Sequence, residues 1–290
     1  MTSSALASAA RPAEHRPSTP SSPMPMIVNH ARGSMSAMPN VLLLGGTTEA
    51  SALARLLAAA QVATTLSYAG RTDNPRPQPV PIRVGGFGGV AGLVAYLQDH
   101  RITHLVDATH PFAATMSAHA IKAARIAGIA HIALTRPAWE AGSGDRWTCV
   151  RDTAAAVAKL AGTPRRILLA LGRMHVEAFA AQPQHHYLLR FVDPPAAPPG
   201  LPSHDLVIDR GPFTAEGDRL LMQSHMIDLV VCKNAGGTGA EAKLVAARQL
   251  KLPVVMIDRP VIGDRIEVCR AEDVLEWLGH EATSATDRGV

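Results

Sequence analysis

Several features typical of secreted, membrane-spanning or metal-binding proteins are missing from this 290-residue sequence. Its three cysteines, Cys149, Cys232 and Cys269, are far apart and form no C-x-x-C pair, so neither a disulfide framework nor a cysteine zinc site is predicted. No apolar run reaches the roughly 18 residues that span a bilayer. The early arginines are not followed by the apolar segment of a secretory signal. We therefore expect a cytoplasmic protein with reduced cysteines, no membrane association and no metal site.

The sequence also lacks a strong excess of charge and has few aromatic residues. The net charge is +4, half of it carried by residues 1–38, and the basic residues are scattered, so a nucleic-acid partner is not expected. Only 4% of the residues are aromatic, and the core must therefore be aliphatic. Such a core is typical of a parallel α/β sheet.

The order of apolar patterns predicts the domain organisation. Residues 1–38 are rich in Ser, Pro and Ala and are expected to be a disordered tail, with Met38 as a candidate natural start. From Val41 onward, strand-length apolar runs alternate with helical patterns, which predicts doubly wound, mostly parallel sheets. The predicted division is a Rossmann-like domain over 39–137, a second one over 138–281, and a tail over 282–290.

A glycine-rich turn, Gly45-Gly46-Thr47, follows the first apolar run, Val41–Leu44. Such a turn lets the backbone approach a phosphate at a helix N-terminus, and Thr47 offers a hydroxyl. The dinucleotide fingerprint G-x-G-x-x-G is absent, because Thr47 stands at its second glycine. An ordinary threonine-capped turn remains the alternative.

The next predicted strand, Ala63–Tyr68, indicates which nicotinamide cofactor fits. NAD-binding units usually place an acid here for the ribose 2′-hydroxyl, but this segment has no acid and is followed by Arg71. An arginine can bind a 2′-phosphate by donating charge-assisted hydrogen bonds to it, so NADPH is predicted. A solvated loop arginine is the alternative, and Arg76 and Arg83 are weaker candidates for the same role.

Two further turns could lie beside a nicotinamide ring. Gly85 and Gly86 belong to a segment with four glycines in five residues, which permits close backbone approach or forms a flexible loop. Thr109, His110 and Pro111 follow the predicted strand His104–Asp107. An unperturbed histidine titrates near neutral pH, although His110 could equally be structural.

A second glycine-rich turn, Gly236-Gly237-Thr238-Gly239, follows the apolar run Leu229–Cys232 and Lys233-Asn234. Cations also stand at or just after other predicted strand ends, which favours a substrate with several carboxylates. They are Arg136, Arg173, Arg190 and Arg210. No motif for a catalytic nucleophile is present, which fits hydride transfer by a bound cofactor.

Taken in order, these loops resemble the precorrin-6A reductase family of cobalamin biosynthesis over about residues 40–280. The matching segments are Leu44-Gly45-Gly46-Thr47-x-Glu49, Ala69-Gly70-Arg71, Gly85-Gly86-Phe87-Gly88, Asp107-Ala108-Thr109-His110-Pro111-Phe112-Ala113, Arg136-Pro137-x-Trp139, Gly172-Arg173, Arg210-Gly211-Pro212-Phe213, Lys233-Asn234-x-Gly236-Gly237-x-Gly239, Lys243-Leu244-x-Ala246-Ala247 and Pro253-Val254-Val255-Met256-Ile257-x-Arg259-Pro260. Ala235 departs from the pattern, where a serine is expected.

The resemblance implies two Rossmann-like domains with the active cleft between them. It implies that NADPH reduces the C18–C19 double bond of precorrin-6A to give precorrin-6B. It further implies that Gly45, Gly46 and Thr47 hold the pyrophosphate, and Arg71 the 2′-phosphate. Gly85, Gly86, Thr109 and Pro111 would shape the nicotinamide pocket, with His110, or a water molecule, as the proton donor. The substrate carboxylates would be held by Arg173, Arg210, Lys233, Asn234, Gly236, Gly237 and Gly239.

Alternative functions remain open at this point. One is a cobalt-precorrin-6A reductase of the anaerobic route, and another is an NAD(P)H-dependent reductase of a different polyanion. A two-domain binding protein without catalysis is a third. Other enzymes of the cobalamin pathway are possible partners. The sequence leaves open the oligomeric state and whether strands cross between the domains.

Overall fold

The computed structural model describes residues 38–70 and 77–287. The expectations for residues 1–37, for Arg71 and for Arg76 lie outside the described residues. Within these ranges, no helix is both long and apolar enough to cross a membrane.

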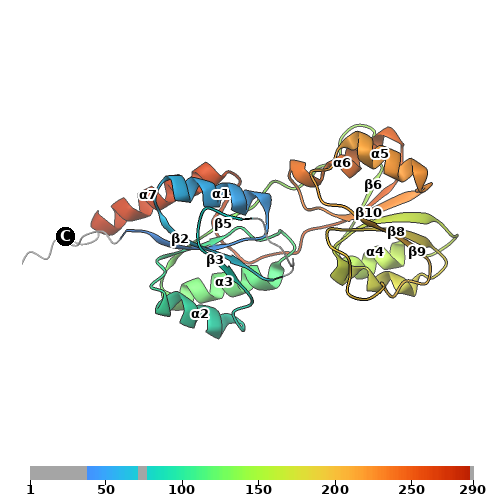
Figure 1. The fold of residues 1–290 in the computed structure, drawn as a ribbon. Coiled ribbons are helices and arrows are strands. Elements are labelled where there is room, and N and C mark those ends of the chain that lie inside the picture. Colours follow the sequence, from blue (N-terminus) through green and yellow to red (C-terminus); the bar gives the residue numbers. More distant parts are fainter. Residues whose placement is uncertain (1–37, 71–76, 288–290) are drawn as a thin grey trace, which may run out of the picture. The chain divides into compact units, whose positions relative to one another are not determined.

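The first sheet contains six parallel strands in the order β12-β5-β4-β1-β2-β3 (Figure 1). Its strands are β1 (Asn40–Leu44), β2 (Ala63–Tyr68), β3 (Ile82–Val84), β4 (His104–Asp107), β5 (Ala130–Leu134) and β12 (Glu267–Val268). Its helices are α1 (Thr48–Ala59), α2 (Val90–Asp99), α3 (Ala114–Ala127) and α7 (Ala271–Asp287). Helices α1 and α7 cover one face, and α2 and α3 cover the other. Because both faces are covered, β1 is an almost continuous apolar run.

The second sheet is also entirely parallel, in the order β6-β11-β10-β7-β8-β9. Its strands are β6 (Trp147–Val150), β7 (Arg166–Ala170), β8 (His186–Phe191), β9 (His204–Ile208), β10 (Leu229–Lys233) and β11 (Val254–Ile257). Its helices are α4 (Thr153–Lys159), α5 (Ala215–Ser224) and α6 (Ala242–Gln249), with the 3₁₀ turns η1 (Arg173–His175), η2 (Glu177–Ala181) and η3 (Thr238–Ala240). Helices α5 and α6 pack on one face, and α4 and η2 pack on the other.

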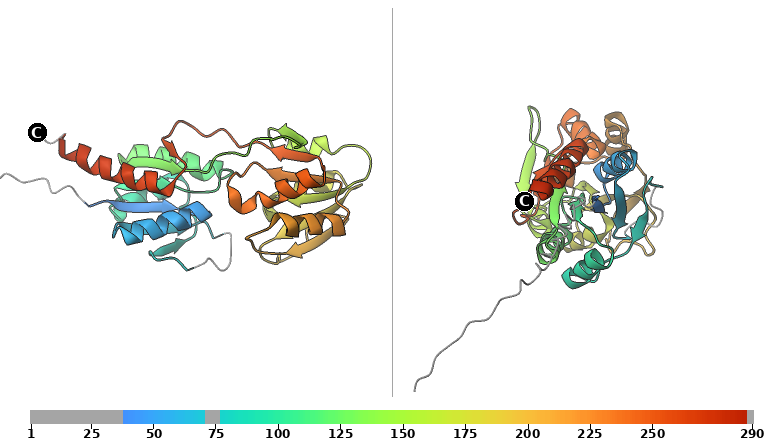
Figure 2. Two further views of the ribbon diagram at one scale, coloured as in Figure 1. Left: turned by 90° about the horizontal axis from the view of Figure 1, so that it is seen from above. Right: turned by 90° about the vertical axis from the view of Figure 1, so that its left-hand side faces the viewer.

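Two edge strands, β6 and β12, show how the chain is divided between the sheets. β6 follows β1 to β5, which all belong to the first sheet, and it joins the edge of the second sheet beside β11. β12 is the last strand and returns to the first sheet beside β5. The chain therefore passes between the sheets twice, along residues 135–146 and again along 258–266 (Figure 2).

The predicted α/β class with two parallel, doubly wound sheets is confirmed. The prediction that residues 138–281 form the second domain is wrong at its end, because β12 pairs with the first sheet and α7 packs against α1. The tail predicted over 282–290 is also wrong in part, since α7 extends to Asp287. Both errors have local causes. β12 has only two residues, too few to show an alternating pattern, and the single Gly279 does not end the helix.

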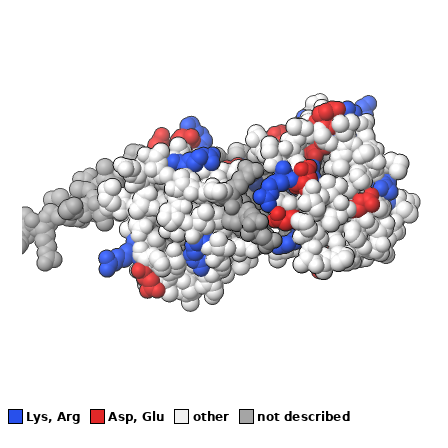
Figure 3. Space-filling view, in the orientation of Figure 1, with Lys and Arg blue, Asp and Glu red and all other residues white. Residues whose placement is uncertain are grey.

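Charged side chains of both signs are interspersed on the face drawn in Figure 3. Many of the arginines in the described ranges lie beside a carboxylate. Two such ion pairs are largely buried, Arg190–Asp218 in the second sheet and Arg265–Asp107 in the first. The arginines therefore cannot be treated as a uniform set of free anion-binding groups.

Candidate active site

The turn after β1 has an open backbone at the N-terminus of α1. Gly46 has a φ angle of +120°, and no atom lies within 4 Å of the position that a Cβ would take. Gly45 donates its N–H to the Ser67 carbonyl at 2.9 Å, which fixes the turn against β2. No described residue accepts a hydrogen bond from the N–H groups of residues 46–49, as expected for the first turn of a helix.

Thr47 is the N-cap of α1. Its hydroxyl donates to the Ala108 carbonyl at 2.8 Å and accepts from the Ala50 N–H at 3.1 Å. The side chain therefore closes the helix and connects it to the residue after β4. Its single hydroxyl proton is already used, so the backbone N–H is the group that this residue offers to a ligand.

Arg83 organises the second glycine segment of the first sheet. Its guanidinium donates to the Gly85 and Gly86 carbonyls at 2.5 and 2.7 Å and to the Ser67 hydroxyl at 3.2 Å. It also lies 3.8 Å above the Phe87 ring. These contacts give Arg83 a role in shaping the turn that contains Gly85 and Gly86.

The turn after β4 is built around a buried carboxylate. One Asp107 oxygen accepts from the Thr109 N–H at 3.1 Å and from the Thr109 hydroxyl at 2.6 Å. The other accepts from Arg265 at 2.7 Å, and both side chains of this pair are almost fully buried. Asp107 thus ties the turn containing Thr109 and Pro111 to the segment that leads into β12.

His110 lies in the same turn with a defined tautomer. Its Nδ1 accepts a hydrogen bond from the Phe112 N–H at 3.2 Å. A backbone N–H can only donate, so the proton of the neutral ring is assigned to Nε2. Another histidine, His131, lies in β5 near Asp107, and burial lowers its pKa. Its Nε2 has no hydrogen-bond partner among the described residues.

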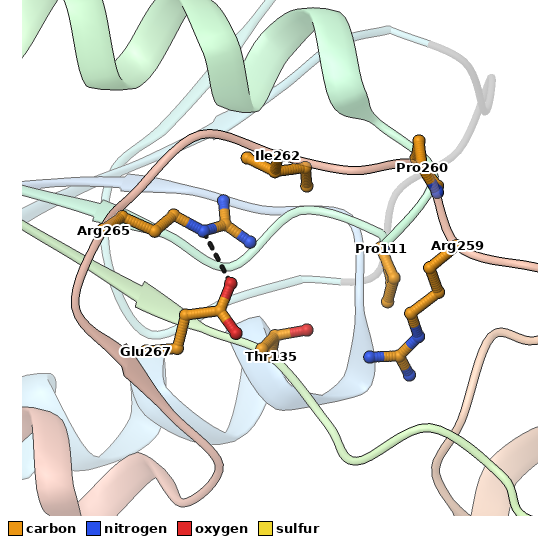
Figure 4. Close-up of a pocket in the computed structure, with 7 residues that line it drawn as sticks. All are labelled: Pro111, Thr135, Arg259, Pro260, Ile262, Arg265 and Glu267. Carbon is orange, nitrogen blue, oxygen red and sulfur yellow. Dashed lines mark hydrogen bonds and ion pairs between the residues drawn. The ribbon is translucent and has the colours of Figure 1, made fainter.

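A pocket of about 180 Å³ opens at the carboxyl ends of β4 and β5 (Figure 4). It is lined by Pro111, Thr135, Arg259, Pro260, Ile262, Arg265 and Glu267. Arg265 donates to Glu267 at 2.8 Å within this pocket. The position agrees with the general rule that open α/β sheets bind ligands beyond the carboxyl ends of their strands.

Of these lining residues, only Pro111 is among the predicted site residues. The Arg259-Pro260 motif carried a signal in the sequence, whereas nothing in the pattern around Arg265 and Glu267 pointed to a site. Their place in the pocket follows from the return of β12 to the first sheet.

In the second sheet, the turn after β10 is fixed by Trp139. The Asn234 amide accepts from the Trp139 N–H at 2.8 Å and donates to the Trp139 carbonyl at 2.9 Å. The Trp139 indole donates to the Gly237 carbonyl at 2.9 Å. The Asn234 side chain therefore holds the turn in place by contacts within the protein.

Gly236 and Gly237 are glycines for a steric reason. Both have positive φ angles, +69° and +72°. A Cβ on Gly236 would collide with the Pro137 carbonyl oxygen, and one on Gly237 would lie 2.5 Å from Arg136 Cδ. Gly239 differs, because no atom lies within 4 Å of its Cβ position. The first two glycines permit close packing on the 136–137 segment, and Gly239 leaves open space.

Two arginines bind the carbonyl groups at the end of β10. Arg136 donates to the Ala235 carbonyl at 2.8 Å. Arg259 donates to the Asn234, Arg136 and Ala235 carbonyls at 2.9, 2.9 and 3.1 Å. Burial lowers the pKa of Arg259, and the nearby positive charge of Arg136 lowers it further. The guanidinium groups thus connect the two segments that pass between the sheets.

The predicted substrate-binding cations have different environments. Arg173 is exposed on η1, Arg210 pairs with Asp193 at 2.8 Å, and the Lys233 ammonium lies 4.8 Å from the centre of the Phe112 ring. Lys243 was not predicted as a site residue. It is buried, its ammonium donates a hydrogen bond to the Ala240 carbonyl, and burial lowers its pKa.

Together, two parallel sheets wound on both faces and a glycine turn at an open helix N-terminus define a Rossmann-like α/β protein. The chain matches a family model described as precorrin-6x reductase CbiJ/CobK over residues 40–279. This match spans most of the chain, and the protein therefore belongs to the precorrin-6x reductase family.

Individual relatives agree with this assignment. The chain is 55% identical over 253 residues to the precorrin-6A reductase of Rhodobacter capsulatus, covering 87% of this chain and 100% of that protein. A solved structure named CobK precorrin-6A reductase superposes with a TM-score of 0.81 at 55% identity, covering 84% and 97% of the two chains. The cobalt-precorrin-6A reductase of Priestia megaterium is 29% identical over 258 residues, covering 84% and 100%.

Proposed function

We propose that this protein reduces the C18–C19 double bond of precorrin-6A with NADPH, giving precorrin-6B in cobalamin biosynthesis. The observation that carries the proposal is the 55% identity to a precorrin-6A reductase over that protein's whole length. The open glycine turn after β1 supplies the matching chemistry. We place the activity in the cytoplasm, since the three cysteines form no disulfide.

The first sheet offers the groups that a dinucleotide needs. The backbone at Gly46 leaves room for a phosphate, and the N–H groups at the start of α1 point to an anion. Gly45, Gly46 and Thr47 would hold the pyrophosphate, with Arg71 on the 2′-phosphate. NADPH, when bound, supplies the hydride. The turn containing Thr109 and Pro111, beside the pocket at β4 and β5, would shape the space for its nicotinamide end. The turn containing Gly85 and Gly86, which follows β3, is the second candidate for this role.

The second sheet would bind the tetrapyrrole substrate. Arg173, Arg210 and Lys233 would pair with its carboxylate arms, and Gly239 leaves space for a close approach. Asn234, Gly236 and Gly237 would contribute mainly by holding their turn in shape. His110, or a water molecule, would donate the proton; as the acid, the His110 ring would be an imidazolium with a proton on both nitrogens, so Nδ1 would have to release the Phe112 N–H first. Other enzymes of the pathway are proposed partners in passing the macrocycle on.

A cobalt-free substrate is favoured over a cobalt-containing one. The identity is 55% to a precorrin-6A reductase but 29% to a cobalt-precorrin-6A reductase. We therefore propose precorrin-6A as the substrate, and its cobalt complex as the second candidate.

The test is an anaerobic reaction of the purified protein with NADPH and precorrin-6A. NADPH loss and the visible spectrum of the macrocycle are followed together, since the chromophore changes when a double bond is reduced. A stoichiometric, coupled change is expected. NADPH binding without any spectral change would contradict the substrate assignment, and a faster reaction with the cobalt complex would favour the second candidate.

The choice of NADPH gives a separate prediction for Arg71. Changing Arg71→Ala should raise the KM for NADPH at least about tenfold, because a charge-assisted contact to a phosphate is worth roughly 1.5–3 kcal/mol. The KM for NADH should change by less than about twofold. Steady-state kinetics with both cofactors check this, and Arg151→Gln, at an exposed position, is the control. Equal losses with NADPH and NADH would contradict a role on the 2′-phosphate.

A further inference from the structure

Glu49 places a negative charge at the end of α1 that is proposed to receive the pyrophosphate. It lies in the first turn of the helix, where a carboxylate stabilises the helix through its dipole. The same charge would repel a phosphate bound at the N–H groups of residues 46–49. A reductase that uses this turn therefore needs a way to offset the Glu49 charge.

Arg136, directly beyond β5, provides the opposite charge. Its Nη1 lies 3.2 Å from the Glu49 carboxylate, and the two side chains are only 13% and 24% exposed. Its Nε donates at the same time to the Ala235 carbonyl at 2.8 Å. One guanidinium thus contacts both the helix that follows the β1 turn and the turn that follows β10.

The position of Arg136 is closely determined by its neighbours. Its own carbonyl accepts a hydrogen bond from Arg259 at 2.9 Å. A Cβ added to Gly237 would lie only 2.5 Å from the Arg136 Cδ, so the two groups are closely packed. The planar guanidinium can serve two acceptors in fixed directions, whereas a lysine ammonium acts as a single point charge. Its geometry therefore suits a bridge between two defined acceptors.

We propose that Arg136 is a positioning residue for the reductase reaction, with two separable roles. Through Glu49 it neutralises the charge beside the pyrophosphate site, and through Ala235 it holds the turn after β10 in place for hydride transfer. This inference rests on the proposed function, because it takes the β1 turn as the NADPH site and the β10 turn as part of the substrate site.

Four variants separate the two roles: Arg136→Lys, Arg136→Gln, Glu49→Gln and the double variant Glu49→Gln/Arg136→Gln. The dissociation constant of NADPH is measured by its fluorescence without substrate. The hydride-transfer rate is measured in a single turnover with precorrin-6A at saturating NADPH. Arg151→Gln, at an exposed arginine, is the matched control, and thermal unfolding checks the fold of each variant.

The expected pattern differs between binding and rate. Arg136→Gln should weaken NADPH binding about tenfold, and the double variant should return to within about twofold of the original protein, because the unpaired carboxylate is gone. The loss in Arg136→Gln should shrink in high salt, which screens charge repulsion. Arg136→Lys should bind NADPH normally but transfer hydride at least about tenfold more slowly, since small displacements of reacting groups are costly.

Three outcomes would overturn the inference. They are an equal loss of NADPH binding in Arg136→Gln and in the double variant, a normal hydride-transfer rate in Arg136→Lys, and a weaker NADPH complex in Glu49→Gln. If Arg136→Gln does not fold, Arg136→Lys and Glu49→Gln still decide between the outcomes. Failure of the original protein to bind NADPH would instead contradict the proposed function, which keeps the two failures distinct.

Discussion

Replacing Gly236 by alanine is expected to destabilise the protein by about 3 kcal/mol and to abolish most of its activity. Alanine at a φ of +69° costs roughly 1–2 kcal/mol. The added methyl group would also meet the Pro137 carbonyl oxygen, and an overpacked site costs a further 1–3 kcal/mol or so. Because the obstacle is backbone, it cannot be relieved by rotating a side chain.

Thermal unfolding of Gly236→Ala should show a melting temperature lower by about 6–12 °C for a domain of this size. Gly239→Ala, three residues later, is the matched control. No atom lies within 4 Å of its Cβ position and its φ angle is outside the positive range, so its melting temperature should change by less than about 2 °C. If the two variants melt at the same temperature, the steric explanation for Gly236 is wrong.

Changing Arg265→Ala should destabilise the protein by about 3 kcal/mol or more. Its partner Asp107 would remain buried without its counter-charge, and breaking one side of a buried ion pair typically costs roughly 3–5 kcal/mol. The hydrogen bonds of Asp107 to Thr109 would remain but would not replace the charge. The pocket lined by Arg265 and Thr135 would lose shape as well, so hydride transfer should slow even in the protein that stays folded.

Arg270→Ala provides a control in the same returning segment. Arg270 is 71% exposed and lies near Glu272, and exposed ion pairs contribute roughly 0–1 kcal/mol. Melting temperatures and single-turnover rates of the two variants should therefore differ clearly. A small effect of Arg265→Ala on both quantities would show that Asp107 does not depend on this arginine.

The main features of the fold could be predicted from sequence because parallel strands covered on both faces are apolar throughout. The runs Val41–Leu44 in β1, Leu229–Cys232 in β10 and Val254–Ile257 in β11 are of this kind, and the helices between the strands follow from their periodicity. The α-helix after the second glycine-rich turn begins only at Ala242, with η3 before it, because the glycine turn uses a different backbone conformation. β12 could not be predicted, since its two residues are identified only by their partner strand.

The candidate site was predictable only where backbone chemistry leaves a sequence signal. The glycines at 45–46 and 236–237 were found because they interrupt a strand-to-helix pattern. Their physical reasons differ, however. Gly46 faces open space, whereas Gly236 packs against Pro137. The Glu49–Arg136 and Asp107–Arg265 pairs join residues far apart in the chain, and no local pattern predicts such contacts. The site roles of Arg173, Arg210 and Lys233 remain predictions.

The return of β12 and α7 to the first sheet also affects how the protein is made. A ribosome releases the chain from its N-terminus, and early domains usually fold before later ones are complete. Here the first sheet lacks its edge strand, and α1 lacks its neighbour α7, until the last part of the chain has emerged. The apolar surface around Val274 and Leu278 is buried only then. The first sheet, whose strands are synthesised first, is therefore completed last, and its exposed apolar surface must avoid aggregation while the rest of the chain is made.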